Sequence, residues 1–129
     1  MKKQKLLRNQ EGFTLVEIIA VLIILGILAA VAVPRYIDLE SNARQRAIDA
    51  GISELNGRES LTWADKKIGV GYTDDGTLQT AVNYSLGGDY TWSAGPVDVG
   101  GTLVFRGTMI EPLVRQPSTS SQPATWRRP

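Results

Sequence analysis

An uninterrupted apolar run at residues 13–33 constrains this chain more than any other feature. Its sequence, FTLVEIIAVLIILGILAAVAV, contains only two polar side chains, Thr14 and Glu17. As a helix with a rise of 1.5 Å per residue, the run would be about 31 Å long, which matches the hydrocarbon core of a bilayer. Residues 1–12 carry Lys and Arg side chains against a single Glu, so the flank before the run is expected on the cytoplasmic side. The run therefore predicts a helix that enters a membrane after synthesis.

Composition excludes several classes of function. The 129 residues contain no Cys and no His. This rules out thiolate and imidazole metal sites, disulfide bonds, and catalysis that needs a Cys or His group. The 14 Lys and Arg residues nearly balance the 13 Asp and Glu residues, so there is no general attraction for nucleic acid. An enzyme based on carboxylates or lysine, a binding module and a structural subunit remain.

Two simple interpretations of the first 33 residues leave features unexplained. A secretory signal peptide fits the basic start and the small residues at 30–32, but the apolar run is longer than the usual 7–15 residues. A plain membrane anchor fits the length of the run. However, a carboxylate inside a membrane helix is unfavourable, by up to about 2.5–3.5 kcal/mol at the helix centre on insertion scales, so an anchor has no use for Glu17.

Cleavage between Gly12 and Phe13 would give Glu17 a partner. The new amino group of Phe13 is cationic and lies four residues before Glu17, one helical turn away. Burying either charge alone would cost several kcal/mol, so pairing within a chain or between neighbouring subunits would fix the axial register of packed helices. This interpretation predicts helices that leave the lipid and pack against copies of themselves.

The sequence GFTLVE at residues 12–17, between a short basic leader and a long apolar run, resembles the processing signal of type IV pilins and of type II secretion pseudopilins. The resemblance covers residues 1–40 and favours a type IV pilin. It implies that residues 1–12 are a leader peptide, that a prepilin peptidase cuts after Gly12 and methylates the amine of Phe13, and that Glu17 is the glutamate needed for assembly.

The resemblance also assigns a role to Gly26 and Pro34 as sites of helix kinking or melting. Pro34 lacks an N–H and clashes with the carbonyl of Ala30, so the helix is expected to kink or unwind near Ala30. Gly26 lies eight residues before Pro34 and lowers the helix propensity in that part of the run. In the family such melting accompanies assembly, and the segment between these two residues is where we expect it.

Residues 34–68 predict an amphipathic helix that continues beyond the apolar run. Its apolar stripe contains Ile48, Ile52 and Leu55 at helical spacing, with Ile37 and Trp63 extending it. On the opposite, solvated face, Glu40 precedes Arg44 and Glu54 precedes Arg58 by four positions, a spacing that favours ion pairs along a helix. Gly69 is the expected terminating glycine.

Residues 69–115 change character, because glycines and short apolar runs replace the helical period. Strands are expected at residues 78–86, 89–93, 102–106 and 108–115. They would form a small antiparallel sheet over the helix stripe, with Trp92, Leu103 and Phe105 in its core. The fold class is therefore α+β, with a long N-terminal α-helix packed against a small antiparallel β-sheet, as in pilins.

Residues 116–129 are rich in Ser, Thr and Pro and are interpreted as a mobile or surface-draped tail, with a binding element as the alternative and Trp126 as the side chain that would dock. The two arginines of this tail are too few to indicate binding to a specific nucleic acid. Loop aspartates would suit calcium but are expected to form turns instead; these are Asp74, Asp75, Asp89 and Asp98. No catalytic, cofactor-binding or metal site is predicted, and the chain is not expected to be an enzyme.

The expected function is that of a structural subunit of a type IV pilus. The subunit would cross the inner membrane once before assembly and then join a helical filament on the cell surface. Its partners would be other copies of the chain, the prepilin peptidase and the pilus or secretion assembly machinery. Two alternatives stay open at this point: a pseudopilin of a type II secretion system, and a membrane-anchored binding module that never polymerises and keeps residues 1–12.

Overall fold

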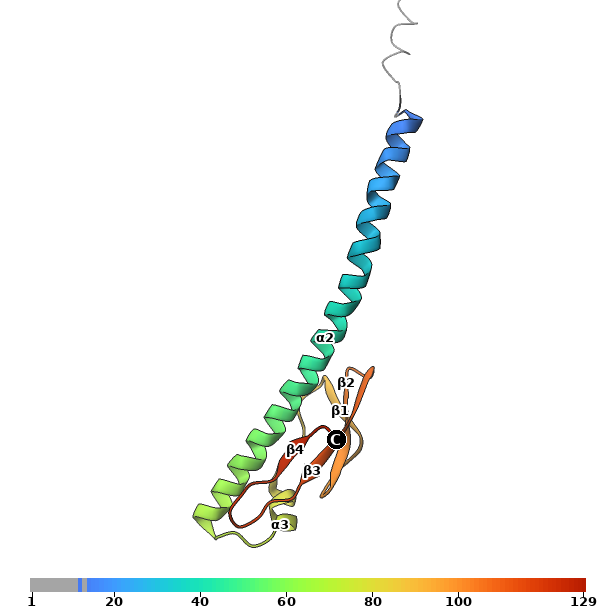
Figure 1. Ribbon diagram of the computed structural model, residues 1–129. Helices are drawn as coiled ribbons and strands as arrows, with labels where there is room; N and C mark the ends of the chain where they lie inside the picture. The colour runs from blue at the N-terminus through green and yellow to red at the C-terminus, as the bar shows by residue number, and fades with distance from the viewer. Residues whose placement is uncertain (1–11, 13) are drawn as a thin grey trace, which may run out of the picture. The chain divides into compact units, whose positions relative to one another are not determined.

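The computed structural model describes residues 12 and 14–129 and has the α+β class that the sequence predicts (Figure 1). In chain order, the elements are α2 (Leu15–Gly69), α3 (Asp75–Ala81), β1 (Tyr90–Val97), β2 (Gly100–Phe105), β3 (Met109–Gln116) and β4 (Thr125–Arg127). The chain divides into two compact units, of which the first ends at Ser41 and the second is Asn42–Pro129. Helix α2 contributes to both units.

The glycine that terminates α2 lies two residues beyond the predicted one. The carbonyl of Lys66 accepts hydrogen bonds from the backbone N–H groups of Val70, at 3.1 Å, and Gly71, at 2.9 Å. Gly71 has a φ of 87°, a left-handed conformation that glycine adopts without steric cost. Gly69, the expected terminating glycine, is instead the last residue of the helix. Gly71, two residues after the last helical residue, therefore provides the left-handed conformation that ends the helix.

The part of α2 within Asn42–Pro129 buries one stripe against the rest of this unit. Ile48 and Leu55 are completely buried, as predicted, and Ile52 is half-buried beside them. Trp63 is also half-buried. The predicted extension to Ile37 is wrong, because that side chain is 58% exposed.

The predicted strand at residues 78–86 is wrong, because its first residues belong to helix α3. Asp74 caps this helix, and its carboxylate accepts hydrogen bonds from the backbone N–H of Thr77, at 2.8 Å, and from the hydroxyl of Thr77, at 2.9 Å. An N-cap of this kind satisfies amide groups that the first helical turn leaves unpaired. The buried side chain of Leu78 holds α3 against the core.

The four strands form one antiparallel sheet in the order β1-β2-β3-β4. The predicted strands near residues 89–93, 102–106 and 108–115 correspond to β1, β2 and β3, with boundaries shifted by a few residues. Leu103 is completely buried, and the predicted core residues Trp92 and Phe105 are half-buried around it. A Cβ atom on Gly101 would lie 2.8 Å from Cζ3 of Trp92, so the indole ring needs glycine at that position.

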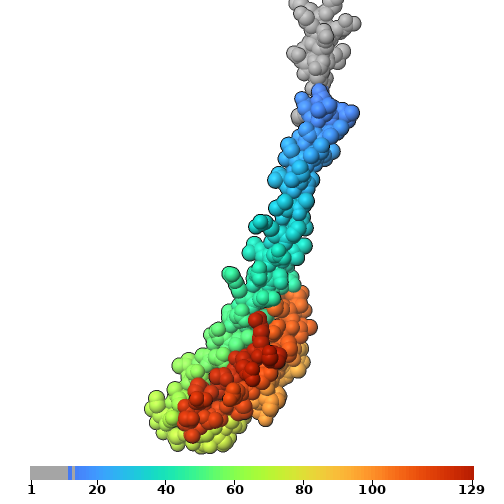
Figure 2. Space-filling model, viewed as in Figure 1, coloured from blue at the N-terminus to red at the C-terminus, as the bar shows by residue number. Residues whose placement is uncertain are grey.

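The interpretation of residues 116–129 as a mobile or surface-draped tail is wrong for the C-terminal part of the segment. These residues include β4, and Trp126 within it is 1% exposed. The register pairs Val114 with Arg127 and Gln116 with Thr125, so β4 completes the sheet. Figure 2 shows the C-terminal residues, in red, lying along the green part of α2.

Candidate functional site

The first half of α2 presents apolar side chains to its surroundings along its whole length. Every described residue up to Ser41 is exposed. Within α2, an 18-residue window has a mean hydropathy of 3.0 and contains no buried residue. By length and composition, this helix is long and apolar enough to cross a membrane. Continuous exposed apolar surface of this extent marks a membrane or an assembly interface.

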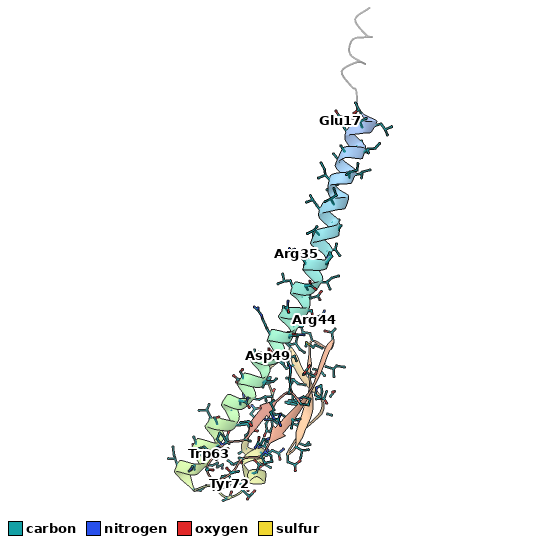
Figure 3. All side chains as sticks on the ribbon, viewed as in Figure 1. Glu17, Arg35, Arg44, Asp49, Trp63 and Tyr72 are labelled. Carbon is teal, nitrogen blue, oxygen red and sulfur yellow. The ribbon has the colours of Figure 1, made fainter. Side chains whose placement is uncertain are left out.

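Glu17 lies at the beginning of this apolar helix and forms a capping box with Thr14 (Figure 3). The backbone N–H of Thr14 donates to Oε2 of Glu17 at 3.0 Å. In return, the backbone N–H of Glu17 donates to the Thr14 hydroxyl at 3.2 Å. This arrangement satisfies two of the unpaired amides at a helix start. The Thr-x-x-Glu spacing is the sequence signal for such a box, whereas the predicted role of Glu17 rests on its charge alone.

The other predicted processing and assembly residues lie in or beside this helix. Gly12 is exposed and precedes the capping box. Phe13 lies outside the described residues, so the pairing of its amine with Glu17 stays a prediction. Helix α2 is continuous through Gly26 and Pro34, and a Cβ atom on Gly26 would have no atom within 4 Å apart from its chain neighbours and the backbone of its own helix. Melting at these two residues therefore also stays a prediction.

A second feature is a buried ion cluster of three side chains: Glu59, Asp75 and Arg115. Arg115 lies between the two carboxylates, with Nε 2.7 Å from Oε1 of Glu59 and Nη1 2.7 Å from Oδ2 of Asp75. The side chains of Arg115, Glu59 and Asp75 are 0%, 2% and 17% exposed, respectively. The cluster joins α2, α3 and β3.

Neutral donors complete the hydrogen bonding of the two carboxylates. The Tyr84 hydroxyl and the Trp126 indole N–H donate to Oε1 of Glu59 at 2.8 and 2.9 Å. The backbone N–H and hydroxyl of Ser118 donate to Oδ1 of Asp75 at 2.6 and 2.7 Å. One cation and two anions would otherwise leave an excess buried negative charge, which these four donors stabilise.

The pKa values of the cluster follow from this geometry. Burial alone raises the pKa of Asp75, but the hydrogen bonds from Arg115 and Ser118 outweigh burial and hold it below its ordinary value. Burial alone lowers the pKa of Arg115, but its bonds to Asp75 and Glu59 outweigh burial and raise it. Both groups are therefore charged at neutral pH. A fully hydrogen-bonded cluster of this kind holds the three elements together.

Two sequence signals could have indicated the cluster. Glu59 follows Leu55 by four residues and thus lies on the buried stripe of α2. Arg115 follows Leu113 by two residues, so both side chains point to the inner face of β3. Charged residues at inward positions indicate a buried ion pair, but the spacing does not predict which two residues pair.

The loop aspartates considered for calcium make other interactions. Asp74 caps α3, and Asp75 belongs to the ion cluster. Asp89 pairs with Arg106 at 3.2 Å, and the backbone carbonyl of Asp98 accepts a hydrogen bond from Arg115 at 3.3 Å. Across residues 12 and 14–129, no three His, Cys, Asp or Glu side chains are grouped so that they could hold a metal ion.

Comparisons with known proteins match part of the chain. Residues 7–33 match the prokaryotic N-terminal methylation motif, a match that includes Gly12, Phe13 and Glu17. The chain is 52% identical over 57 residues to the type IV narrow pilus major component PilA5 of Thermus thermophilus, covering 44% of this chain and 49% of that protein. Two fimbrial proteins of Pseudomonas aeruginosa are each 35% identical over 86 residues, covering 56% of this chain and 54% of each relative.

The chain thus spans about half the length of the curated relatives it matches. No solved structure matches it significantly. The motif, the names of the relatives and the fold class agree, and the predicted resemblance to type IV pilins is confirmed.

Proposed function

We propose, on the premise that this chain is a type IV pilin, that it is the structural subunit of a pilus filament. The single observation that carries the proposal is the exposed apolar half of α2, which begins at Leu15 within the methylation motif. Water is an unfavourable surrounding for such a surface, whereas lipid or other copies of the same helix can cover it. The role is structural and requires no catalysis.

In the proposed assembly, processing converts a membrane protein into a filament subunit. A prepilin peptidase cuts after Gly12 and methylates the amine of Phe13. The apolar half of α2 then resides in the inner membrane until the assembly machinery transfers it into a bundle of copies. There the carboxylate of Glu17 neutralises the amine of Phe13 of the same or a neighbouring subunit, which sets the register. The filament extends from the cell surface.

The relatives favour this function over the alternatives. Their names describe a pilus component and fimbrial proteins. A pseudopilin of a type II secretion system would share the methylation motif and the apolar helix, so these two features do not separate it from a pilin. A non-polymerising binding module would have no need for the motif.

The intact mass and N-terminal sequence of the chain, taken from a sheared extracellular fraction, test the proposal. We expect a chain that starts at Phe13 and carries one additional methyl group. A start at Met1 or Val33 would contradict processing as a pilin and indicate an anchor or a signal peptide. A start at Phe13 found only in the cell envelope would contradict the extracellular pilus and support the secretion pseudopilus.

A further inference from the structure

Residues 117–129, named the strap here, follow β3 and contact α2 along two stretches. At its far end, the main chain of Trp126 pairs twice with the side-chain amide of Asn56. The N–H of Trp126 donates to Oδ1 at 2.6 Å, and Nδ2 donates to the carbonyl of Trp126 at 3.0 Å. The Trp126 ring packs 5.4 Å from the ring of Trp92 and 5.7 Å from the ring of Tyr84.

At the near end of the strap, three successive backbone carbonyls are each held by a different side chain. The carbonyl of Ser118 accepts from the Tyr72 hydroxyl at 3.0 Å. The carbonyl of Thr119 accepts from the indole N–H of Trp63 at 2.9 Å. The carbonyl of Ser120 accepts from Nζ of Lys67, also at 2.9 Å. Figure 3 shows Trp63 and Tyr72 near the end of α2, where this part of the strap lies.

The strap donates hydrogen bonds to the carboxylates of the buried ion cluster. Ser118 and Trp126, one near each end of the strap, together donate three of the hydrogen bonds that the carboxylates of Asp75 and Glu59 accept. Arg115 supplies the positive charge that keeps these two carboxylates side by side. Without Arg115 the buried carboxylates would repel each other and require water, and opening of the strap would admit that water.

The backbone hydrogen bonds between the other strands of the sheet do not depend on the strap. Strand β4 occupies the edge of the sheet and pairs only with the last three residues of β3. The pairing of β1 with β2 and of β2 with β3 does not involve β4. An edge segment of this kind is a candidate for opening as an independent unit.

We propose that residues 117–129 open and reclose as one unit, and that Arg115, acting through Glu59 and Asp75, is the latch that keeps them closed. Opening withdraws Trp126 from between Tyr84 and Trp92 and exposes the edge of β3. The proposal goes beyond the pilus function, because it concerns a single chain whether or not that chain polymerises.

Hydrogen exchange measured by mass spectrometry on the full chain in detergent micelles tests the latch. In the variant Arg115→Met, which keeps much of the volume of the side chain, we expect exchange in residues 117–129 to be at least about tenfold faster. Exchange in β1 and in β2 should stay within about twofold of the unmodified chain. The matched control is Arg106→Met, because Arg106 pairs with Asp89 on the surface, with both side chains more than half exposed. It should leave the strap unchanged.

Two results would overturn the proposal. Unchanged exchange in the strap of Arg115→Met would show that Arg115 is no latch, and equal acceleration in the strap, β1 and β2 would show that the strap is no separate unit. If Arg115→Met fails to fold, Ser118→Ala decides, because it removes the hydroxyl that donates to Asp75 and leaves the apolar core in place. Faster exchange confined to residues 117–129 supports the strap, whereas no change or acceleration throughout the sheet contradicts it.

Discussion

Gly51 and Gly57 lie on the same helix but in different surroundings. A Cβ atom on Gly51 would lie 3.0 Å from Cε1 of Tyr90 and 3.2 Å from Cδ2 of Leu103. A Cβ atom on Gly57 would have no atom within 4 Å apart from its chain neighbours and the backbone of its own helix. Gly51 thus allows α2 to approach the sheet closely, while Gly57 only weakens the helix.

Alanine at these two positions should therefore have different effects. Gly57→Ala should raise the free energy of unfolding by about 0.5–1 kcal/mol, because alanine favours the helix. Gly51→Ala gains the same helix propensity but forces Tyr90 and Leu103 apart, so its free energy of unfolding should be about 1–2 kcal/mol below that of Gly57→Ala. Urea unfolding of the full chain in micelles, followed by tryptophan fluorescence, measures both values. An equal increase in the free energy of unfolding in the two variants would contradict the close approach of α2 to the sheet at Gly51.

At the residue scale, sequence patterns predicted the apolar core better than the buried polar one. The spacing of Ile48 and Leu55 is a helical period, and both side chains are completely buried. Nothing comparable predicts that Glu59 meets Arg115, because the partners are 56 residues apart and their pairing depends on how the sheet lies on α2. Periodicity reports which face of an element is buried and not which side chains share the interior.

At the scale of elements, local hydrogen bonding decided what short segments became. The sequence Asp75-Gly76 indicates a turn. However, Asp74 caps the N-terminus of α3 by accepting a hydrogen bond from the N–H of Thr77, so these residues form the first turn of the helix. The polar composition of the strap predicts a tail, yet one buried tryptophan and its pairing with β3 make it a strand. Composition describes an average, whereas Trp126 alone supplies much of the apolar area that holds β4.

The cap and the ion cluster make α3 sensitive to acid. Hydrogen bonds from Thr77 lower the pKa of Asp74, and hydrogen bonds from Arg115 and Ser118, against the effect of burial, lower the pKa of Asp75. A carboxyl with a lowered pKa in the folded state stabilises the fold above its unfolded value, 3.8 for both groups. This stabilisation is lost as the pH falls below 3.8 through the folded values.

The free energy of unfolding should therefore decrease as the pH is lowered from 5 to about 2.5. The groups that face Asp75 are Arg115 from β3 and Ser118 from the strap, with Glu59 and Tyr84 on the other side of Arg115. Asp75→Asn removes the titrating group, so this variant should be less stable at pH 7 and should show a shallower dependence on pH. Denaturant unfolding at several pH values measures both. An unchanged pH dependence in Asp75→Asn would contradict the assignment.

At the scale of the whole molecule, the sequence predicted the α+β class and the long helix because both depend on strong, continuous patterns. The apolar run needs no tertiary context to be recognised as a membrane-length helix. The role of Glu17 is less direct, because its carboxylate closes a capping box with Thr14 in addition to any pairing with an amine. Two variants can separate these contributions.

Glu17→Gln keeps a side chain that can close the capping box but removes the charge, whereas Glu17→Ala removes both. If the charge pairs with the amine of Phe13, both variants should reduce the yield of sheared filaments by about tenfold or more, since an amine left unpaired among apolar helices is costly. Filament yield and the axial rise of subunits by electron microscopy provide the measurement. Normal filaments from Glu17→Gln would assign the requirement to the capping box, and normal filaments from Glu17→Ala would refute both contributions.

The pairing of Asn56 with the main chain of Trp126 bears on how copies of this chain can stand close together. An unpaired edge strand attracts other strands, and crowded β domains are at risk of joining their sheets. Here the amide of Asn56 occupies both backbone groups of the middle residue of β4, as a neighbouring strand would. The sheet is thereby self-terminated at that edge. The β domains of neighbouring copies can therefore stay separate at high local concentration. Contacts between the copies then involve surfaces other than the β4 edge.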